Sequence, residues 1–231
     1  MTREHIHFVF DMYGTLIDTA CIHKHVHDLG LPNSVAFTSR WRSKQLEYAF
    51  RRALMQNHVT FETCTAQALE YTLQALGMSL TETQTHDLLD HYNHLPPYPE
   101  AHSALSKLNL PDYRLHVFTN GSDQSAEILL QNAKLRHFFH TVVSTAPTRT
   151  FKPAPAAYAY LLEQTRSTAE NTFLISSNPF DIHGAKSADL KTLFIQRDDT
   201  VLLDPWPDLQ PCVTITSLSE IHDIFAVAEQ K

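Results

Sequence analysis

The sequence predicts an α/β fold in which a doubly wound parallel sheet carries an inserted helical cap subdomain. Six short runs rich in β-branched and aromatic residues are separated mostly by helical patterns; they span 6–11, 113–119, 140–145, 172–176, 191–196 and 212–216. Strands that alternate with helices are typical of a parallel sheet covered on both faces. The stretch 20–95 interrupts this alternation and is helical throughout.

Composition narrows the class of protein further. The 231 residues are 43% hydrophobic, which suffices to bury a core without disulfides. A net charge of −7 without a basic run argues against a nucleic-acid partner. The three scattered cysteines predict reduced thiols and a cytoplasmic location. The immediate entry into the first strand and the absence of a long apolar run predict neither a signal peptide nor membrane contact.

Histidine is abundant, with 15 residues in the chain. His5 and His7 alternate along the chain, as do His23, His25 and His27, without Cys or Glu at a recognised ligand spacing. We therefore expect surface histidines and no metal site.

The first strand ends in a carboxylate. Three apolar residues, 8–10, form a buried strand, and Asp11 stands at its carboxyl end. Gly14 then allows a tight turn and Thr15 adds a hydroxyl. Ligands of open α/β sheets bind in the crevice beyond the carboxyl ends of the strands. This position predicts that Asp11 is a nucleophile rather than a surface charge.

The helical insertion follows directly after this strand. Its first helix carries one apolar face, at Leu46, Ala49, Phe50, Ala53 and Leu54. A second carries Leu69, Leu73 and Leu76 and stops at Gly77; a third opens with the capping box Thr81–Gln84 and ends before Pro96. We assign residues 1–17 and 99–231 to the core and 18–98 to the cap. A cap in this position would exclude water from Asp11, although a packing subdomain without a catalytic role is the alternative.

A cation lies on the apolar stripe of the first cap helix. Arg42 precedes Leu46 by four residues and Ala49 by seven, which places the three on one face. A buried cation near the N-terminal end of a helix is unfavourable. A snorkelling arginine would explain an isolated case, but beside Asp11 an anion-binding role is the better hypothesis.

Two further sites follow the second and third core segments. Thr119 and Asn120 end an apolar strand and could bind an anion, or they could form an ordinary turn with Ser122 as the helix N-cap. Lys152 precedes Pro153, which fits the first turn of a helix. Because a cation opposes the dipole there, Lys152 is expected to point at an acid, unless it is simply solvated in a loop.

The strand at 172–176 also ends in polar residues. Ser176, Ser177 and Asn178 follow its apolar part, and Asp181 falls in the first turn of the next helix, where a carboxylate suits the dipole. One carboxylate with three neutral side chains makes a weak site for a hard cation such as magnesium.

These motifs together resemble a known family. Residues 11–15, Asp-Met-Tyr-Gly-Thr, resemble the Asp-x-Asp-Gly-Thr motif of the haloacid dehalogenase superfamily, with Tyr13 in place of the second acid. Phosphatases of that superfamily use the second acid to protonate a leaving alcohol, whereas a halide needs no proton. The Tyr13 variant and the cap stretch Trp41–Tyr48 resemble the (S)-2-haloacid dehalogenase branch, and the likeness covers nearly the whole chain.

The resemblance implies a role for each candidate residue. It makes Asp11 the nucleophile, surrounded by Lys152, Ser176, Asn178 and Asp181. It makes Arg42 and Asn120 the halide cradle, and the orienting hydroxyls are Thr15, Thr119 and Tyr158. The residues lining the apolar side of the substrate are Tyr13, Leu46, Phe61 and Phe180. Thr119 replaces the serine usual in the family, and Phe180 stands where the family often has tryptophan.

The reaction implied is hydrolysis of short (S)-2-haloalkanoic acids to (R)-2-hydroxy acids through an aspartyl ester, without cofactor or metal. The resemblance also allows a homodimer. A magnesium-dependent phosphatase and a non-catalytic binding protein of the same fold are the alternatives. A magnesium requirement would favour the first, and ligand binding without halide release the second.

Overall fold

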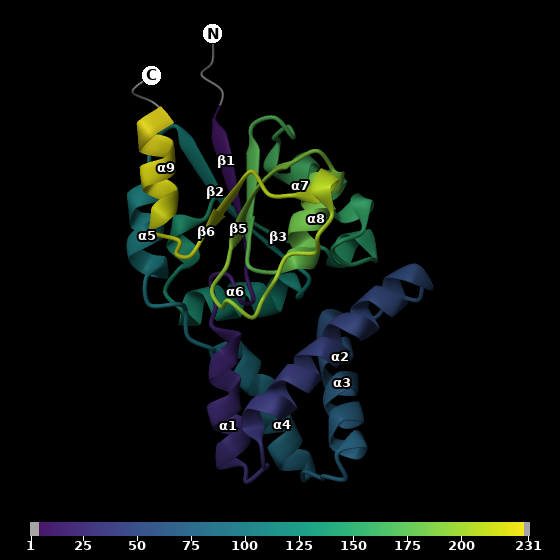
Figure 1. Cartoon of the computed structure of the whole chain (residues 1–231). Helices are drawn as coiled ribbons and strands as arrows, with labels where there is room; N and C mark the ends of the chain where they lie inside the picture. The colour runs from purple at the N-terminus through teal and green to yellow at the C-terminus, as the bar shows by residue number, and fades with distance from the viewer. Residues whose placement is uncertain (1–4, 229–231) are drawn as a thin grey trace.

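A computed structural model, which describes residues 5–228, confirms the predicted fold class. A six-stranded sheet has the order β3-β2-β1-β4-β5-β6, and all its neighbouring strands are parallel (Figure 1). The strands are β1 (Ile6–Asp11), β2 (Tyr113–Thr119), β3 (Thr141–Ser144), β4 (Thr172–Ser176), β5 (Lys191–Ile195) and β6 (Val213–Ile215). Each lies within one residue of a predicted strand at either end.

Helices cover both faces of this sheet. The core helices are α5 (Ala101–Leu108), α6 (Asp123–Asn132), α7 (Pro155–Thr165), α8 (Pro179–Ser187) and α9 (Glu220–Ala228). Phe8 and Phe10 of β1 pack into one apolar cluster with α5, α6 and α9, while Val9 packs into a second cluster with α7 and α8. Alternate residues of the central strand therefore anchor the two layers of helices.

The register of the strands brings three polar ends to one edge. Asp11 lies opposite Phe118 of β2, and Phe10 lies opposite Ile175 of β4. Thr119 and Ser176, each one residue further along, therefore end their strands beside Asp11. This edge is the carboxyl end of the sheet, where ligands of doubly wound folds bind.

Four helices form a separate group beyond that edge, and we call this group the cap (Figure 1). They are α1 (Ile22–Asp28), α2 (Ser34–Leu54), α3 (Phe61–Ala75) and α4 (Glu82–Asp90). The two chain segments that join cap and core are paired, because Asp18 N donates to Pro96 O and Tyr98 N donates to Leu16 O, each at 2.9 Å. Short 3₁₀ turns complete the chain at Thr19–Cys21, His91–His94, Arg136–Phe138, Ala146–Thr148 and Pro207–Leu209.

The buried face of α2 differs from the prediction. Its buried residues are Phe37, Trp41, Gln45 and Ala49. Leu46 and Phe50 are only partly buried, and the side chain of Leu54 is 86% exposed. The spacing of apolar residues did not predict the buried face, because that face contains a glutamine, Gln45, whose amide is hydrogen-bonded.

The other cap helices follow the sequence more closely. The capping box of Thr81 and Gln84 is present at the start of α4. Helix α3 ends at Ala75 and Gly77 adopts a left-handed φ of 64°, but Leu76, predicted on its apolar face, is 38% exposed. The expectation of surface histidines is wrong for His7, which is buried in β1. Within residues 5–228, no helix is both long and apolar enough to span a membrane.

Candidate active site

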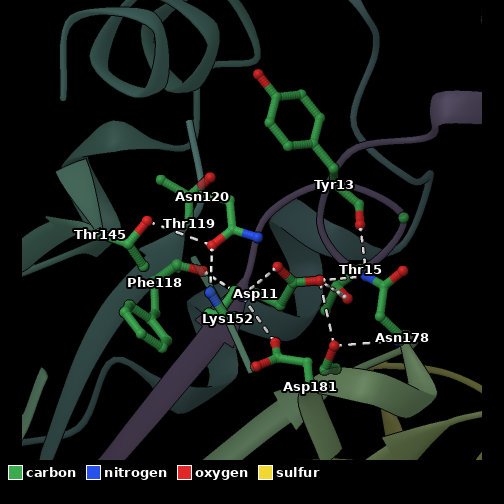
Figure 2. A network of polar contacts seen from close by, with 12 residues as sticks. Asp11, Tyr13, Thr15, Phe118, Thr119, Asn120, Thr145, Lys152, Asn178 and Asp181 are labelled. Atoms are coloured by element: carbon green, nitrogen blue, oxygen red, sulfur yellow. Dashed lines mark hydrogen bonds and ion pairs between the residues drawn. The ribbon is translucent and has the colours of Figure 1, made fainter. Parts of the chain in front are cut away.

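Asp11 lies buried at the carboxyl end of β1, in the middle of a dense hydrogen-bond network (Figure 2). Its Oδ2 atom accepts from Thr15 Oγ1 at 3.1 Å, from Ser176 Oγ at 3.2 Å and from Asn178 Nδ2 at 2.6 Å. Its Oδ1 atom accepts from Lys152 Nζ at 2.8 Å. One oxygen is therefore held by three neutral donors, while the other faces a single cation.

Lys152 joins the two carboxylates of the site. Its side chain is 1% exposed, and its Nζ lies 2.8 Å from both Asp11 Oδ1 and Asp181 Oδ2 and donates to Phe118 O at 3.0 Å. Burial alone would lower the pKa of Lys152, but the charges and hydrogen bonds of Asp11 and Asp181 outweigh it and raise the pKa above its ordinary value. Lys152 is therefore a protonated cation at neutral pH.

The predicted direction of Lys152 agrees with the structure, but its predicted place in the chain needs a correction. Helix α7 begins at Pro155 rather than at Pro153, so Lys152 precedes the helix by three residues. The ammonium group contacts the two acids, which neutralise it directly.

Asp181 is fully buried in the first turn of α8, as the sequence predicts. Its Oδ1 atom accepts from Tyr158 Oη at 2.8 Å. Burial raises the pKa of Asp181; the Lys152 charge lowers it without cancelling the rise, and the Asp11 charge adds to it. Burial also raises the pKa of Tyr158 well above its ordinary value. Asp181 therefore has a stronger affinity for a proton than an ordinary aspartate, which suits a general base.

The turn after β2 presents an amide to the site. Asn120 Oδ1 accepts from Lys152 N at 2.8 Å and from Thr145 Oγ1 at 3.3 Å, so the amide nitrogen is directed to the side of Asp11 (Figure 2). Thr119 Oγ1 accepts from Gly121 N at 3.1 Å and thus shapes the turn. Ser122 is the N-cap of α6, as its alternative interpretation predicted.

Arg42 approaches the site from the cap. Its NH1 donates to Gln45 Oε1 at 2.5 Å, and its side chain is partly buried. Burial lowers the pKa of Arg42, and the fields of Tyr92, Asp11 and Tyr13 act in the opposite sense. The charge of Asp11 is thus among those that act on this guanidinium.

Two of the remaining candidates, Tyr13 of the core and Phe61 of the cap, form an apolar wall between these two parts. The ring of Tyr13 points away from the Asp11 carboxylate (Figure 2) and lies 6.4 Å from the ring of Phe61, centroid to centroid. Burial raises the pKa of Tyr13 above its ordinary value, so this phenol stays neutral. The ring of Phe180 contacts Phe50 at 5.2 Å, and Leu46, partly exposed, lies one helical turn after Arg42.

A cavity of about 140 Å³ lies against this wall. Its lining residues include Tyr13, Gln45, Phe61, Glu62, Thr65 and Tyr92. Both cap and core contribute to it, so the position of the cap determines its shape.

Sequence reasoning missed a direct contact between cap and core. Glu62 of α3 accepts from Ser122 N at 2.9 Å, at the N-terminus of α6. Burial would raise the pKa of Glu62, but hydrogen bonds from Ser122 and Ser125 lower it overall. A carboxylate is stabilised at a helix N-terminus. A helix-start residue facing another helix start leaves no signal in a single sequence.

Arg197 was also missed, and Ser177 was noted only as a polar residue after the strand at 172–176. Arg197 NH2 donates to Thr15 O at 2.6 Å, its NH1 pairs with Glu100 Oε1 at 2.8 Å, and its guanidinium lies 3.4 Å from the ring centroid of Tyr98. Ser177 Oγ donates to Gly14 O at 2.7 Å. Arg197 comes shortly after the end of β5, much as Asp11 lies at the end of β1. This position after a strand was the signal that could have found it.

The two carboxylates of the site are engaged with a side-chain cation. Among residues 5–228, no group of three or more His, Cys, Asp or Glu side chains could hold a metal. The two carboxylates at the site already share the ammonium of Lys152, and Tyr13 offers a neutral phenol that points away. Magnesium requires several oxygen ligands that remain free to bind it.

Fold and site together define a capped α/β enzyme with a carboxylate at the end of its first strand. The chain belongs to the haloacid dehalogenase-like hydrolases, whose family model matches residues 7–189, and within them to the (S)-2-haloacid dehalogenase branch. It is 37% identical to an (S)-2-haloacid dehalogenase of Xanthobacter autotrophicus over 179 residues, which cover 78% of this chain and 70% of that protein.

Two further likenesses cover more of the chain. A haloacetate dehalogenase H-2 of Moraxella sp. (strain B) is 36% identical over 81% of this chain and 84% of its own length. The solved structure of the L-2-haloacid dehalogenase from Xanthobacter autotrophicus with chloropropionic acid covalently bound superposes with a TM-score of 0.88, at 28% identity over 96% of this chain and 98% of that chain.

Proposed function

We propose that this chain hydrolyses short (S)-2-haloalkanoic acids to (R)-2-hydroxy acids through an ester formed on Asp11. One observation carries the proposal: the buried Asp11 carboxylate has three donors on Oδ2 and only Lys152 on Oδ1. Oδ1 therefore keeps a lone pair for attack while Oδ2 is held fixed. The names of the related dehalogenases, and the covalently bound chloropropionic acid of the solved relative, support the same reaction.

In the first step, Asp11 Oδ1 attacks C2 of the substrate from the side opposite the halogen. The C2–halogen bond breaks, the halide leaves with the bonding electrons, and the configuration at C2 inverts. The leaving halide needs no proton, which agrees with a neutral tyrosine, Tyr13, at the position of the phosphatase acid. The cation of Arg42 and the amide of Asn120 stabilise the charge that develops on the halogen.

In the second step, water attacks the carbonyl carbon of the ester at Asp11. Asp181 accepts a proton from this water, with Lys152 orienting it. The former Oδ2 becomes the oxyanion and stays hydrogen-bonded to Thr15, Ser176 and Asn178. The bond from the ester carbon to Oδ1 then breaks, and the released alkoxide takes a proton from Asp181. Asp11, left with the second proton of the water, loses it to solvent and becomes a carboxylate again.

The other candidates hold the substrate and these groups in place. Tyr158 positions Asp181 through its hydroxyl, and Thr119 shapes the turn that carries Asn120. The residues that contact the apolar side of the substrate are Tyr13, Leu46, Phe61 and Phe180. The half-buried ring of Phe180 packs against Phe50 of the cap, so cap and core both contribute to this side.

We further propose that residues 18–98 act as the cap and that residues 1–17 and 99–231 act as the catalytic core. The two linkers support this division, because the segment that leaves the core and the segment that returns to it are paired with each other. A cytoplasmic location and a homodimer stay predictions. The free thiols of the three cysteines support the first, and sedimentation of the purified protein tests the second.

Halide release from the two enantiomers of 2-chloropropionate, each with and without excess chelator, tests the proposal. We expect release from the (S) enantiomer alone, (R)-lactate as the product, and the same rate in the chelator. Loss of activity in chelator, restored by magnesium, would favour a metal-dependent hydrolase. Tight binding of 2-chloropropionate without release of chloride would favour a binding protein.

A further inference from the structure

A buried glutamine of the cap contacts the guanidinium that the proposed mechanism assigns to the leaving halide. Gln45 lies on the face of α2 that packs inside the cap, and it is 1% exposed. Its Oε1 accepts from Arg42 NH1 at 2.5 Å. Burying a polar amide is costly unless its hydrogen bonds are satisfied, so its retention at this position calls for a role.

A second residue fixes the orientation of this amide. Gln45 Nε2 donates to Thr65 Oγ1 at 2.5 Å, and Thr65 Oγ1 donates its only proton to Phe61 O at 2.9 Å. Because that proton is used, Thr65 offers only lone pairs to Gln45. The amide must therefore present its NH₂ group to Thr65 and its oxygen to Arg42, which has donors alone.

The chain of contacts thus runs from the backbone of α3 to a side-chain cation of α2. It starts at Phe61 O, passes through Thr65 and Gln45, and ends at the guanidinium of Arg42. The remaining charged or polar groups that act on Arg42 are Tyr92, Asp11 and Tyr13. Within residues 5–228, none of these three groups is hydrogen-bonded to Arg42.

We propose that Gln45 is a positioning residue, held in orientation by Thr65, that fixes the Arg42 guanidinium where the halide departs. The inference rests on the proposed role of Arg42 as a halide ligand. A long arginine side chain without this anchor would occupy several rotamers, and part of the transition-state stabilisation would be spent on ordering it. Gln45 acts in this proposal through Arg42 rather than on the halide.

Gln45→Leu tests this inference, because leucine keeps the volume and removes both hydrogen bonds. We expect kcat on (S)-2-chloropropionate to fall about 10- to 100-fold, the range for a lost hydrogen bond to a charged group. The fall on (S)-2-bromopropionate should be smaller, since bromide is the better leaving group and needs less stabilisation. KM should change much less than kcat.

Thr65 supplies a conservative rescue. Thr65→Val removes the acceptor for Gln45 Nε2, and we expect an intermediate loss of kcat with the same difference between chloride and bromide. Thr65→Ser keeps the hydroxyl and should recover most of the lost rate. Gln74→Leu, an exposed glutamine on α3, is the matched control and should leave both rates unchanged.

A double-mutant cycle separates failure of this inference from failure of the proposed function. If Gln45 acts through Arg42, Gln45→Leu should cost little in an Arg42→Lys background. The same loss in both backgrounds, or equal losses for chloride and bromide, would overturn the positioning role. An Arg42→Lys variant with a normal rate would instead remove the halide role of Arg42 itself, whatever Gln45 does.

Discussion

The core side and the cap side of the site are built differently. On the core side, Asp11, Lys152 and Asp181 are almost fully buried, and each makes several hydrogen bonds between 2.6 and 3.2 Å long. On the cap side, Arg42 and Leu46 are partly exposed, and the guanidinium is held through Gln45. The rigid core positions the bond-making atoms, while the cap supplies groups that assist departure of the halide.

This difference predicts how substitutions should divide. Changes on the core side remove a reacting atom or leave a buried charge unpaired, and both effects are large. Changes on the cap side remove one of several stabilising contacts and should lower the rate without abolishing it. The substitutions below, ordered by expected effect, test this division.

Asp11→Asn should have the largest effect. An amide is a poor nucleophile, so halide release under single-turnover conditions should fall by at least about 10⁴-fold. The fold should persist, because asparagine has the same shape and its amide oxygen can still accept either from Lys152 or from the donors that face Oδ2. Circular dichroism and thermal unfolding provide the control. Halide release at a rate within tenfold of the parent would contradict the role of Asp11.

Lys152→Met should come next and should affect both rate and stability. It leaves Asp11 and Asp181 buried without their shared cation, so we expect a loss of about 3–5 kcal/mol in the free energy of unfolding and at least a 10²-fold loss of rate. Urea unfolding and halide release measure the two effects. Lys107→Met, at an exposed position of α5, is the matched control. Equal stability of the two variants would contradict a buried ion pair at the site.

The core side was also the more predictable of the two from sequence. Asp11, Thr119 and Ser176 each end an apolar strand, and parallel strands bring such ends together without further information. The prediction of the buried face of α2 was wrong, because a pattern of hydrophobic residues cannot predict the burial of Gln45. That burial depends on Thr65, 20 residues away. For the same reason, the pattern of hydrophobic residues did not predict that His7 is buried.

Contacts between cap and core were not predictable for a related reason. Glu62 and Ser122 lie on helix starts that are 60 residues apart in the chain, and neither has a distinctive local pattern. Such contacts depend on how the cap docks on the sheet, whereas the strand ends depend only on the topology of the sheet.

Arg42→Lys should have a moderate effect, as expected for the cap side. Lysine keeps the charge but loses the forked donor geometry and the hydrogen bond to Gln45, so kcat should fall about 10- to 100-fold. Steady-state halide release on (S)-2-chloropropionate provides the measurement. A fall as complete as that of Asp11→Asn would break the proposed division between core and cap, and a normal rate would remove the anion role.

The smallest effect on turnover is expected for two buried histidines of the core. His7 Nδ1 lies 3.0 Å from His116 Nε2, and burial lowers their pKa values to about 4 and about 3. Below the ordinary histidine pKa of about 6.5, these two rings bind protons in the unfolded chain, whereas they stay neutral in the folded chain. Stability conferred by this pair is therefore complete above pH 6.5 and declines as the pH falls toward 4.

Urea unfolding at pH 7.5 and pH 5 measures this decline. Between these values we expect the two rings to account for a loss of about 2–4 kcal/mol in the free energy of unfolding. The double variant His7→Val, His116→Val should lose correspondingly less stability on acidification and should keep its turnover at pH 7.5. An unchanged pH dependence in the double variant would contradict the burial of neutral histidines.

A single turnover in oxygen-18 water tests the central claim, that Asp11 itself forms the bond to C2. With enzyme in excess over (S)-2-chloropropionate, the first product oxygen should come from the Asp11 carboxylate. We therefore predict unlabelled lactate, label in Asp11 by mass spectrometry of the peptide that contains it, and labelled lactate only in later turnovers. Labelled lactate in the first turnover, with no label in Asp11, would mean that water attacks C2 directly and would contradict the covalent mechanism.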